Sequence, residues 1–319
     1  MSKEIKVLFG VDSSEFAREA VAGAANLLKD NRKLEMTIFH GIPEPDPGHI
    51  FEPSLSPEEV EKHLQLWSRE RQKVIRLAKE AAIGAGFDPE RVNTSYEERC
   101  KDPVISMINL ANKENFGVIA LARWGARTLA QKMMGHVTYK LMNMAYHLPL
   151  WMIDPRVASH NLLITVVGAG ISRRIVDHTI RYFSHLKESK FTLFHVIPPL
   201  APELHTSSYW EIIRDLSGEE RQENMAQRME AYLEKAKSIA KEGKERLISA
   251  GIPEDKVVVK FQPQKEGIAR DILVELEEGN YGILVIGRKG VRDITQFGLG
   301  SKANKLIHAA HAFMVCLVN

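Results

Sequence analysis

The 319-residue chain has few cysteines, no long apolar run and almost no net charge, and each absence excludes a class of protein. Only Cys100 and Cys316 occur, without metal-ligand spacing, so we expect two buried thiols, no structural disulfide and a reducing, cytoplasmic setting. No stretch approaches the roughly 20 apolar residues that span a bilayer. The start, from Met1 to Glu4, runs into a strand pattern and does not resemble a signal peptide. The net charge of +2 and the lack of a basic block argue against a nucleic-acid partner.

An internal repeat organises the chain. Two segments recur at one offset of 165 residues, and a third recurs at 155, so ten extra residues lie between the second and third strands of the second copy. Such a long period indicates a domain duplication and not a solenoid. We expect two domains, 1–155 and 160–319, with a seam near Asp154-Pro155. The paired segments are AGFDPERV at 85 and AGIPEDKV at 250, FGVIALARWG at 116 and YGILVIGRKG at 281, and FHGIP at 39 and FHVIP at 194.

Each copy alternates apolar strands with amphipathic helices, which predicts an α/β fold with a parallel sheet covered on both faces. The predicted strands of the first half are Ile5–Val11, Leu34–His40, Val92–Tyr96, Val118–Ala122 and Pro149–Ile153. Those of the second half are Leu162–Val167, Phe191–Val196, Val257–Phe261, Ile283–Gly287 and Phe313–Val318. Predicted helices include Pro57–Gly84, Pro103–Lys113, Met133–Ala145, one from about Ser172, one within Trp210–Ser249, Ile268–Glu277 and Ser301–Ala309.

A glycine-rich loop after the fourth strand of the second copy predicts a phosphate site. The sequence reads Gly287-x-x-Gly290, then nine residues, then Gly300-Ser301. Glycine lets the backbone approach a ligand closely, and the helix that follows presents unpaired N–H groups and the positive end of its dipole. The chain contains no Gly-x-x-x-x-Gly-Lys-Ser/Thr motif, which excludes an ordinary P-loop ATPase.

This spacing resembles the ATP-binding signature of the universal stress protein family, and the resemblance covers the chain once per half, as in the tandem bacterial type. It implies two tandem doubly wound five-stranded parallel-sheet domains of the adenine-nucleotide α-hydrolase type. It also implies binding of ATP or AMP, with magnesium left open, slow or absent hydrolysis, and a role in stress survival. Family members usually dimerise through the last strand, so the strands Pro149–Ile153 and Phe313–Val318 are expected to pair the two halves as an intramolecular pseudo-dimer. A further homodimer stays open.

The resemblance implies two unequal sites. In the second half the loop is largely intact, but Gly168 stands where the family has an acidic residue. In the first half an acidic residue is present, but Ala122 replaces the first glycine and His136 replaces the serine. The nucleotide-binding residues expected in the second half are Val196, Gly287, Lys289, Gly290, Gly300, Ser301 and Lys302, and those of the weaker first-half site are Asp12, Gly125 and Gly135.

The sequence is compatible with three functions. The leading one is an adenine-nucleotide-binding regulatory protein with a protein partner, which is not an enzyme. A slow ATP hydrolase is the second, although only Asp293 is acidic around the loop. The third is a scaffold or chaperone-like protein with vestigial sites. His40 and His195 each end an apolar strand, and we expect both to pack and not to bind a ligand.

Overall fold

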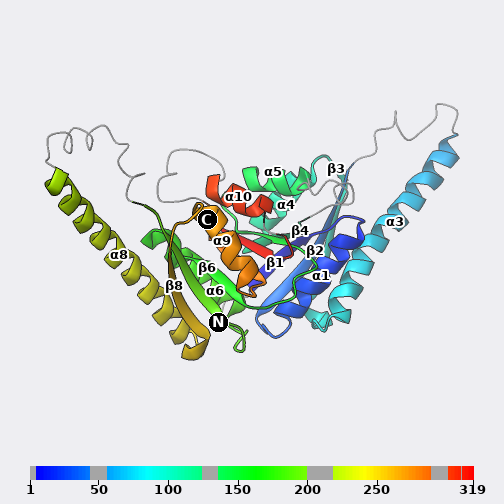
Figure 1. Cartoon of the computed structure of the whole chain (residues 1–319). Coiled ribbons are helices and arrows are strands. Elements are labelled where there is room, and N and C mark those ends of the chain that lie inside the picture. Colours follow the sequence, from blue (N-terminus) through cyan, green and yellow to red (C-terminus); the bar gives the residue numbers. More distant parts are fainter. Residues whose placement is uncertain (1–4, 44–55, 124–135, 200–217, 289–300, 310) are drawn as a thin grey trace.

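The computed structural model describes residues 5–43, 56–123, 136–199, 218–288, 301–309 and 311–319, and forms one ten-stranded sheet in the order β3-β2-β1-β4-β5-β10-β9-β6-β7-β8 (Figure 1). The first five positions are the strands of the first half, and the last five are those of the second. Within each half all neighbouring strands pair in parallel. Each half is therefore a doubly wound five-stranded sheet, which confirms the predicted fold class.

The elements of the first half are β1 (Ile5–Gly10), α1 (Glu15–Leu28), β2 (Leu34–Pro43), α3 (Pro57–Gly84), β3 (Val92–Cys100), α4 (Pro103–Lys113), β4 (Val118–Ala122), α5 (His136–Met144) and β5 (Leu150–Ile153). Those of the second half are β6 (Leu162–Thr165), α6 (Ala169–Phe183), β7 (Phe191–Ile197), α8 (Gly218–Ser249), β8 (Val257–Pro263), α9 (Ile268–Glu278), β9 (Ile283–Gly287), α10 (Ser301–Ala309) and β10 (Met314–Val318). Short 3-10 turns precede β3 and β8.

The helices form two layers, one on each face of the sheet. Residues of α1, α3, α6 and α8 share one apolar core with one face of the strands, and residues of α4, α5, α9 and α10 share a second core with the other. Both cores contain side chains from both halves, so apolar burial runs across the whole sheet. Central strands such as β4 and β9 are apolar along nearly their entire length because both of their faces are covered.

The two halves join through their last strands. β5 and β10 pair antiparallel, with Ile153 opposite Met314 and Trp151 opposite Cys316. This pairing confirms the expected intramolecular pseudo-dimer. It also removes two exposed sheet edges, since each last strand covers the other. Both cysteines are buried and free.

Helix starts follow the capping residues of the sequence. Ser56 and Glu59 form a capping box at the start of α3, with Pro57 at its first position. The start expected at about Ser172 is wrong, because α6 begins at Ala169 with Gly168 as its N-cap. Glycine can adopt the extended N-cap conformation without contributing a side chain to the cap. The segment 133–135, at the start of the predicted helix Met133–Ala145, lies outside the described residues.

The two longest helices lie at opposite ends of the molecule. α3 and α8 both extend outward beyond the sheet (Figure 1). Their inner parts are held by the core, as the burial of Ala78, Ala82, Ala240 and Leu247 indicates. Among the described helices, none is long and apolar enough to cross a membrane.

Candidate functional site

The sheet order creates one candidate crevice in each half. β1 lies between β2 and β4, and β6 lies between β7 and β9, so the chain leaves β1 and β4, or β6 and β9, toward helices on opposite faces. Ligands of open parallel sheets bind beyond the carboxyl ends of the strands at such a switch point. The loop predicted to bind phosphate follows β9 in the chain, and the end of β9 borders the second crevice.

In the second half the structure describes both ends of this loop. Gly287 ends β9 and is partly buried, and Ser301 and Lys302 open α10 with exposed side chains. Lys289, Gly290 and Gly300 lie outside the described residues. The N-terminus of a helix carries unpaired N–H groups and partial positive charge, so Ser301 begins an element suited to an anion.

Val196 reaches this crevice through its backbone. Its side chain is 5% exposed and belongs to the core on the α9–α10 face, so it does not line an open pocket. The carbonyl oxygen of Phe194 accepts a hydrogen bond from the amide of Val166 at 2.8 Å, an ordinary length. This is the last contact between β6 and β7, whose pairing ends at Phe194. Backbone groups alternate in direction along a strand, so the polar groups of Val196 point the same way as those of Phe194, past the end of β6. The amide and carbonyl of Val196 thus face the space above the end of β6.

The start of α6 borders the same crevice without a side-chain cap. Gly168 has an extended backbone and provides no capping hydrogen bond, whereas Ser14 at the start of α1 accepts from the amide of Ala17 at 3.1 Å. Hydrogen bonds between the strands show which residues of the two halves are equivalent. The amides of Val11 and Val166 donate to equivalent carbonyls of β2 and β7. Val167, one residue before Gly168, therefore corresponds to Asp12. The acidic residue is missing from the second half in either alignment.

The first crevice is built differently. Asp12 accepts from the amide of Ser14 at 3.0 Å and also from its hydroxyl, so its carboxylate supports the N-cap of α1. Ala122 ends β4, and His136 opens α5 with an exposed side chain. Gly125 and Gly135 lie outside the described residues. The side chains that the structure describes here add a negative charge and close a helix N-terminus, and both features disfavour an anion.

The two histidines near the carboxyl ends of β2 and β7, His40 and His195, have equivalent roles. His40 Nδ1 lies 2.7 Å from the carbonyl of Val11, and His195 Nδ1 lies 2.8 Å from that of Val166. Only a protonated Nδ1 can donate to a carbonyl, which assigns the tautomer. His195 Nε2 also lies 2.9 Å from the hydroxyl of Tyr232, and burial lowers the pKa of His195. Each ring links its own strand, β2 or β7, to the backbone just after the neighbouring strand, β1 or β6. This is in keeping with the expected packing role.

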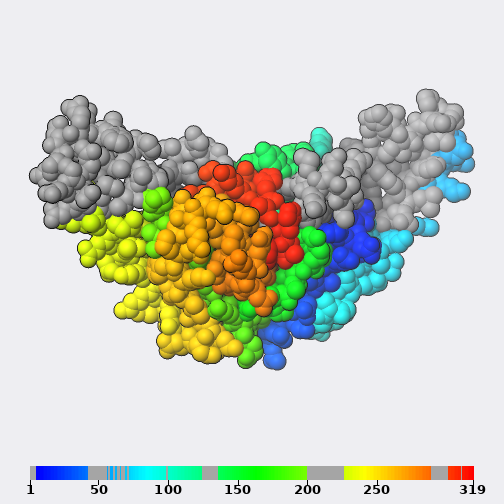
Figure 2. Space-filling model, viewed as in Figure 1, coloured from blue at the N-terminus to red at the C-terminus, as the bar shows by residue number. Residues whose placement is uncertain are grey.

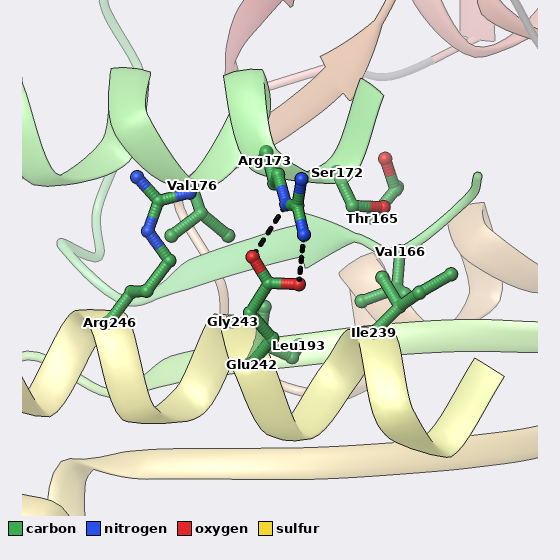
Figure 3. A pocket seen from close by; sticks show the side chains of 10 residues that line it. All are labelled: Thr165, Val166, Ser172, Arg173, Val176, Leu193, Ile239, Glu242, Gly243 and Arg246. Atoms are coloured by element: carbon green, nitrogen blue, oxygen red, sulfur yellow. Dashed lines mark hydrogen bonds and ion pairs between the residues drawn. The ribbon is translucent and has the colours of Figure 1, made fainter. Parts of the chain in front are cut away.

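A pocket lies beside the second crevice, between α6 and α8. Its open volume is about 290 Å³, including solvent at its mouth. Arg173 on α6 and Glu242 on α8 point toward one another and form an ion pair of 2.6 Å (Figure 3). The residues that line it are Thr165, Val166, Ser172, Arg173, Val176, Leu193, Ile239, Glu242, Gly243 and Arg246. The enclosed part of the pocket measures only about 10 Å³, roughly the space of one water molecule, so the pocket does not by itself provide a nucleotide site.

Two buried arginines were not singled out by the sequence reasoning. Arg123 follows β4 and Arg288 follows β9, and their exposed fractions are 2% and 3%. The available signal was the recurrence of arginine at the same place in both copies of the repeat. Burial lowers the pKa of each guanidinium to about 10, so both stay charged at neutral pH.

Comparison with known proteins gives one family. The model of the universal stress protein family matches residues 5–152 and again residues 160–318. The chain is also similar to universal stress protein YxiE of Bacillus subtilis, with 23% identity over 146 residues, which is 44% of this chain and 93% of that protein.

Solved structures show the same architecture. A universal stress protein from Archaeoglobus fulgidus superposes with a TM-score of 0.63 at 15% identity, covering 98% of this chain and 97% of that one. A functionally unknown protein from Pseudomonas aeruginosa gives a TM-score of 0.56 at 12% identity, covering 98% and 91%. At these identities the likeness concerns the fold alone. Because the family model accounts for nearly the whole chain in two copies, this protein belongs to the universal stress protein family as a tandem of two family domains.

Proposed function

We propose that this protein binds one adenine nucleotide, ATP or AMP, in its second half, and that the bound nucleotide alters a surface recognised by a protein partner. The observation that carries the proposal is the arrangement around β6 and β9. A glycine-rich loop between Gly287 and Ser301 joins β9 to α10 at the switch point, next to an α6 N-terminus with no side-chain cap. Family membership supports the same ligand class.

The residues of the second crevice fit the parts of an adenine nucleotide. Val196 offers a backbone N–H and a carbonyl, which suit the donor and acceptor edge of an adenine ring. Ser301 and Lys302 stand at the start of α10, where a hydroxyl, an ammonium group and helix amides suit phosphate oxygens. The sequence adds Lys289, Gly290 and Gly300 to this set. A bound magnesium ion would supply charge neutralisation for a triphosphate.

The contrast between the halves favours one ligand per chain. Asp12 and the Ser14 cap occupy the start of α1, whereas the equivalent region of the second half carries neither a carboxylate nor a side-chain cap. A phosphate group is repelled by the first arrangement and attracted by the second. We therefore propose that the first half supports the structure of the second half and does not itself bind a nucleotide.

The first experiment is to denature freshly purified protein and identify the released small molecules by chromatography and mass spectrometry. We expect AMP, ADP or ATP at about one per chain, since among the described residues only the second crevice combines an uncapped helix start with the absence of a carboxylate. Two per chain would mean that the first half binds as well. An empty protein that also ignores added nucleotide would reject the proposal and favour the scaffold function.

Matched substitutions at equivalent positions locate the site. Ser301→Asp places a carboxylate at the start of α10, where it supports the helix but repels phosphate. We expect it to raise the Kd for ATP at least about tenfold while the fold survives. His136→Asp is the matched control in the first half and should leave binding unchanged. Equal loss of binding in both variants would contradict the assignment to the second half. Gly290→Asp tests the loop itself, with the same expected loss.

Binding and turnover are separated by following phosphate release. We propose that the protein acts by binding ATP and not by hydrolysing it. When ATP is added in excess, we therefore expect no steady release of phosphate. Sustained multiple-turnover release would favour an ATP hydrolase instead. Partner recognition is then tested by comparing wild-type and Ser301→Asp protein as bait, each with and without ATP.

A further inference from the structure

The buried arginines cross the seam between the halves in opposite directions. Arg288 of the second half donates to the carbonyl of Met142 and, at 3.2 Å, to that of Ala145, both at the end of α5. Arg123 of the first half donates to the carbonyl of Ile307 in the last turn of α10. Met142 and Ile307 stand 165 residues apart, as do the two arginines, so the contacts are equivalent under the repeat. Each half thus holds the last helix of the other.

These contacts use the negative end of each helix. The last carbonyls of a helix have no partner within the helix and carry partial negative charge. A buried guanidinium satisfies them with charge-assisted hydrogen bonds, and its planar fork holds them in one geometry. In Figure 2, α10 (red) and α5 (green) lie next to one another at the surface, above the strands β4 and β9 that the two arginines follow.

The first half holds the end of α10 at a second point. Asp154, which is fully buried, accepts from the amide of Ala312 at 3.1 Å, between α10 and β10. The carboxylate of Asp154 also attracts the Arg123 guanidinium and receives two hydrogen bonds from the side chain of Arg156. Its equivalent in the second half is Asn319, whose side-chain oxygen accepts from Arg288 at 2.6 Å. The contacts that hold the end of α10 therefore include the carboxylate of Asp154, whereas those that hold the end of α5 include the neutral side-chain amide of Asn319.

Both ends of the second-half loop are consequently anchored to the first half. The loop starts at Arg288, whose side chain is fixed on α5, and it ends at α10, whose last turn is fixed by Arg123. We propose that Arg123 is a positioning residue for the nucleotide site of the opposite half, because it sets the place of α10 relative to β9. This inference rests on the proposed function. It adds that the second half does not bind nucleotide independently of the first.

Titration of ATP into the full chain tests the inference. Arg123→Met keeps an unbranched apolar side chain close in size to the arginine stem and removes its charge and donors. We expect it to raise the Kd for ATP about tenfold, the scale of one lost charge-assisted hydrogen bond. Arg123→Lys, which keeps the charge, should recover part of the affinity. The control is Trp151→Phe, a seam substitution on the opposite face of the sheet, which should lower stability and leave the Kd unchanged.

The outcomes separate the two proposals. A wild-type chain that binds neither ATP nor AMP would overturn the proposed function and this inference together. A folded Arg123→Met chain that binds ATP as the wild type does would overturn the inference alone, as would an equal loss of affinity in Trp151→Phe.

A second measurement uses the wild-type chain alone, so it does not depend on whether a variant folds. Hydrogen exchange of the wild-type chain with and without ATP should show added protection at 136–145 and 118–123, in the first half, as well as at α10. Protection confined to the second half would also overturn the inference.

Discussion

Trp151 and His178 are joined across the seam between the two halves: the indole Nε1–H of Trp151 on β5 donates to Nε2 of His178 on α6 over 2.9 Å. Both side chains are buried, and Tyr182 stacks edge-on against Trp151 with ring centres 4.9 Å apart. Trp151 lies opposite Cys316 in the β5–β10 ladder, so the large ring of one half meets a small side chain of the other. This cluster is the aromatic centre of the intramolecular interface.

The buried histidine makes stability depend on pH. Burial and the nearby Arg181 charge lower the pKa of His178 to about 3, whereas the unfolded chain has an ordinary pKa near 6.5. Below pH 6.5 the unfolded state takes up a proton that the folded state refuses, so stability falls as the pH falls toward 3. His178→Gln keeps an acceptor for Trp151 and cannot titrate. We expect its loss of unfolding free energy between pH 7 and 4.5 to be smaller than that of the wild type by about 2–3 kcal/mol.

Denaturant titrations at several pH values measure this difference. His147→Gln, at an exposed histidine, is the control and should keep the wild-type slope. A slope for His178→Gln identical to that of the wild type would show that another group carries the pH dependence.

Equivalent glycines of the two halves are required for different reasons. A Cβ at Gly117 would overlap the hydroxyl of Tyr182, and a Cβ at Gly282 would overlap the backbone carbonyl of Ser159. The Tyr182 hydroxyl is buried and has no hydrogen-bond partner in the described part of the chain, and burial raises its pKa to about 12. We expect Tyr182→Phe to be neutral or to stabilise by about 1 kcal/mol.

Thermal or chemical unfolding then distinguishes the two glycines. Gly117→Ala should destabilise by about 1–3 kcal/mol and should be rescued in the double variant with Tyr182→Phe. Gly282→Ala should destabilise by a similar amount or more, and Tyr182→Phe should not rescue it because backbone cannot be trimmed. Additive effects of Gly117→Ala and Tyr182→Phe would contradict the overlap.

Asp154 provides stability that acid removes. Burial alone would raise the pKa of this carboxyl, but hydrogen bonds from Arg156 and from the Ala312 amide outweigh burial and hold the pKa at about 2. Because the folded-state pKa lies below the ordinary value of 3.8, the contribution is present above pH 4 and is lost as the pH falls through 2. Asp154→Asn should lower the unfolding free energy at pH 7 by about 2 kcal/mol and flatten its fall between pH 4 and 2.

The matched control for Asp154 is a surface ion pair. Asp177 pairs with Arg246 where both side chains are partly exposed, so Asp177→Asn should change stability by less than about 1 kcal/mol. Unfolding at pH 7 and pH 3 compares the two variants. Equal effects would mean that burial of Asp154 adds nothing.

Asp12 is predicted to support structure and not ligand binding. Its carboxylate holds the amide of Ser14, the N-cap of α1. Asp12→Ala should therefore cost about 1 kcal/mol of stability, as the loss of a capping turn does. The number of nucleotides bound per chain, measured by calorimetry, should stay the same. A fall in that number would assign Asp12 to a working site in the first half.

Local pattern and repeat were sufficient to predict most elements. Ser56 as a possible N-cap and Pro57 at the first helical position led to the correct start of α3, and an apolar run followed by glycine led to the correct bounds of β9. These signals are local, because caps and apolar periods act within a turn or a strand. The extension of β2 to Pro43 and of β3 to Cys100 was missed, because it depends on continued pairing between the two strands across an irregular register.

The sequence by itself determined the duplication, the parallel sheet of each half and the loop between Gly287 and Ser301. Recurring segments indicate the first, apolar spacing indicates the second, and the positions of the glycines indicate the third. Only the tertiary structure decided which groups meet. The backbone of Val196 faces the crevice because β6 ends beside it, and Arg123 reaches Ile307 because antiparallel β5–β10 pairing brings α10 next to the first half. Such contacts join residues far apart in the chain, and their partners are set by strand order and packing, which no local pattern specifies.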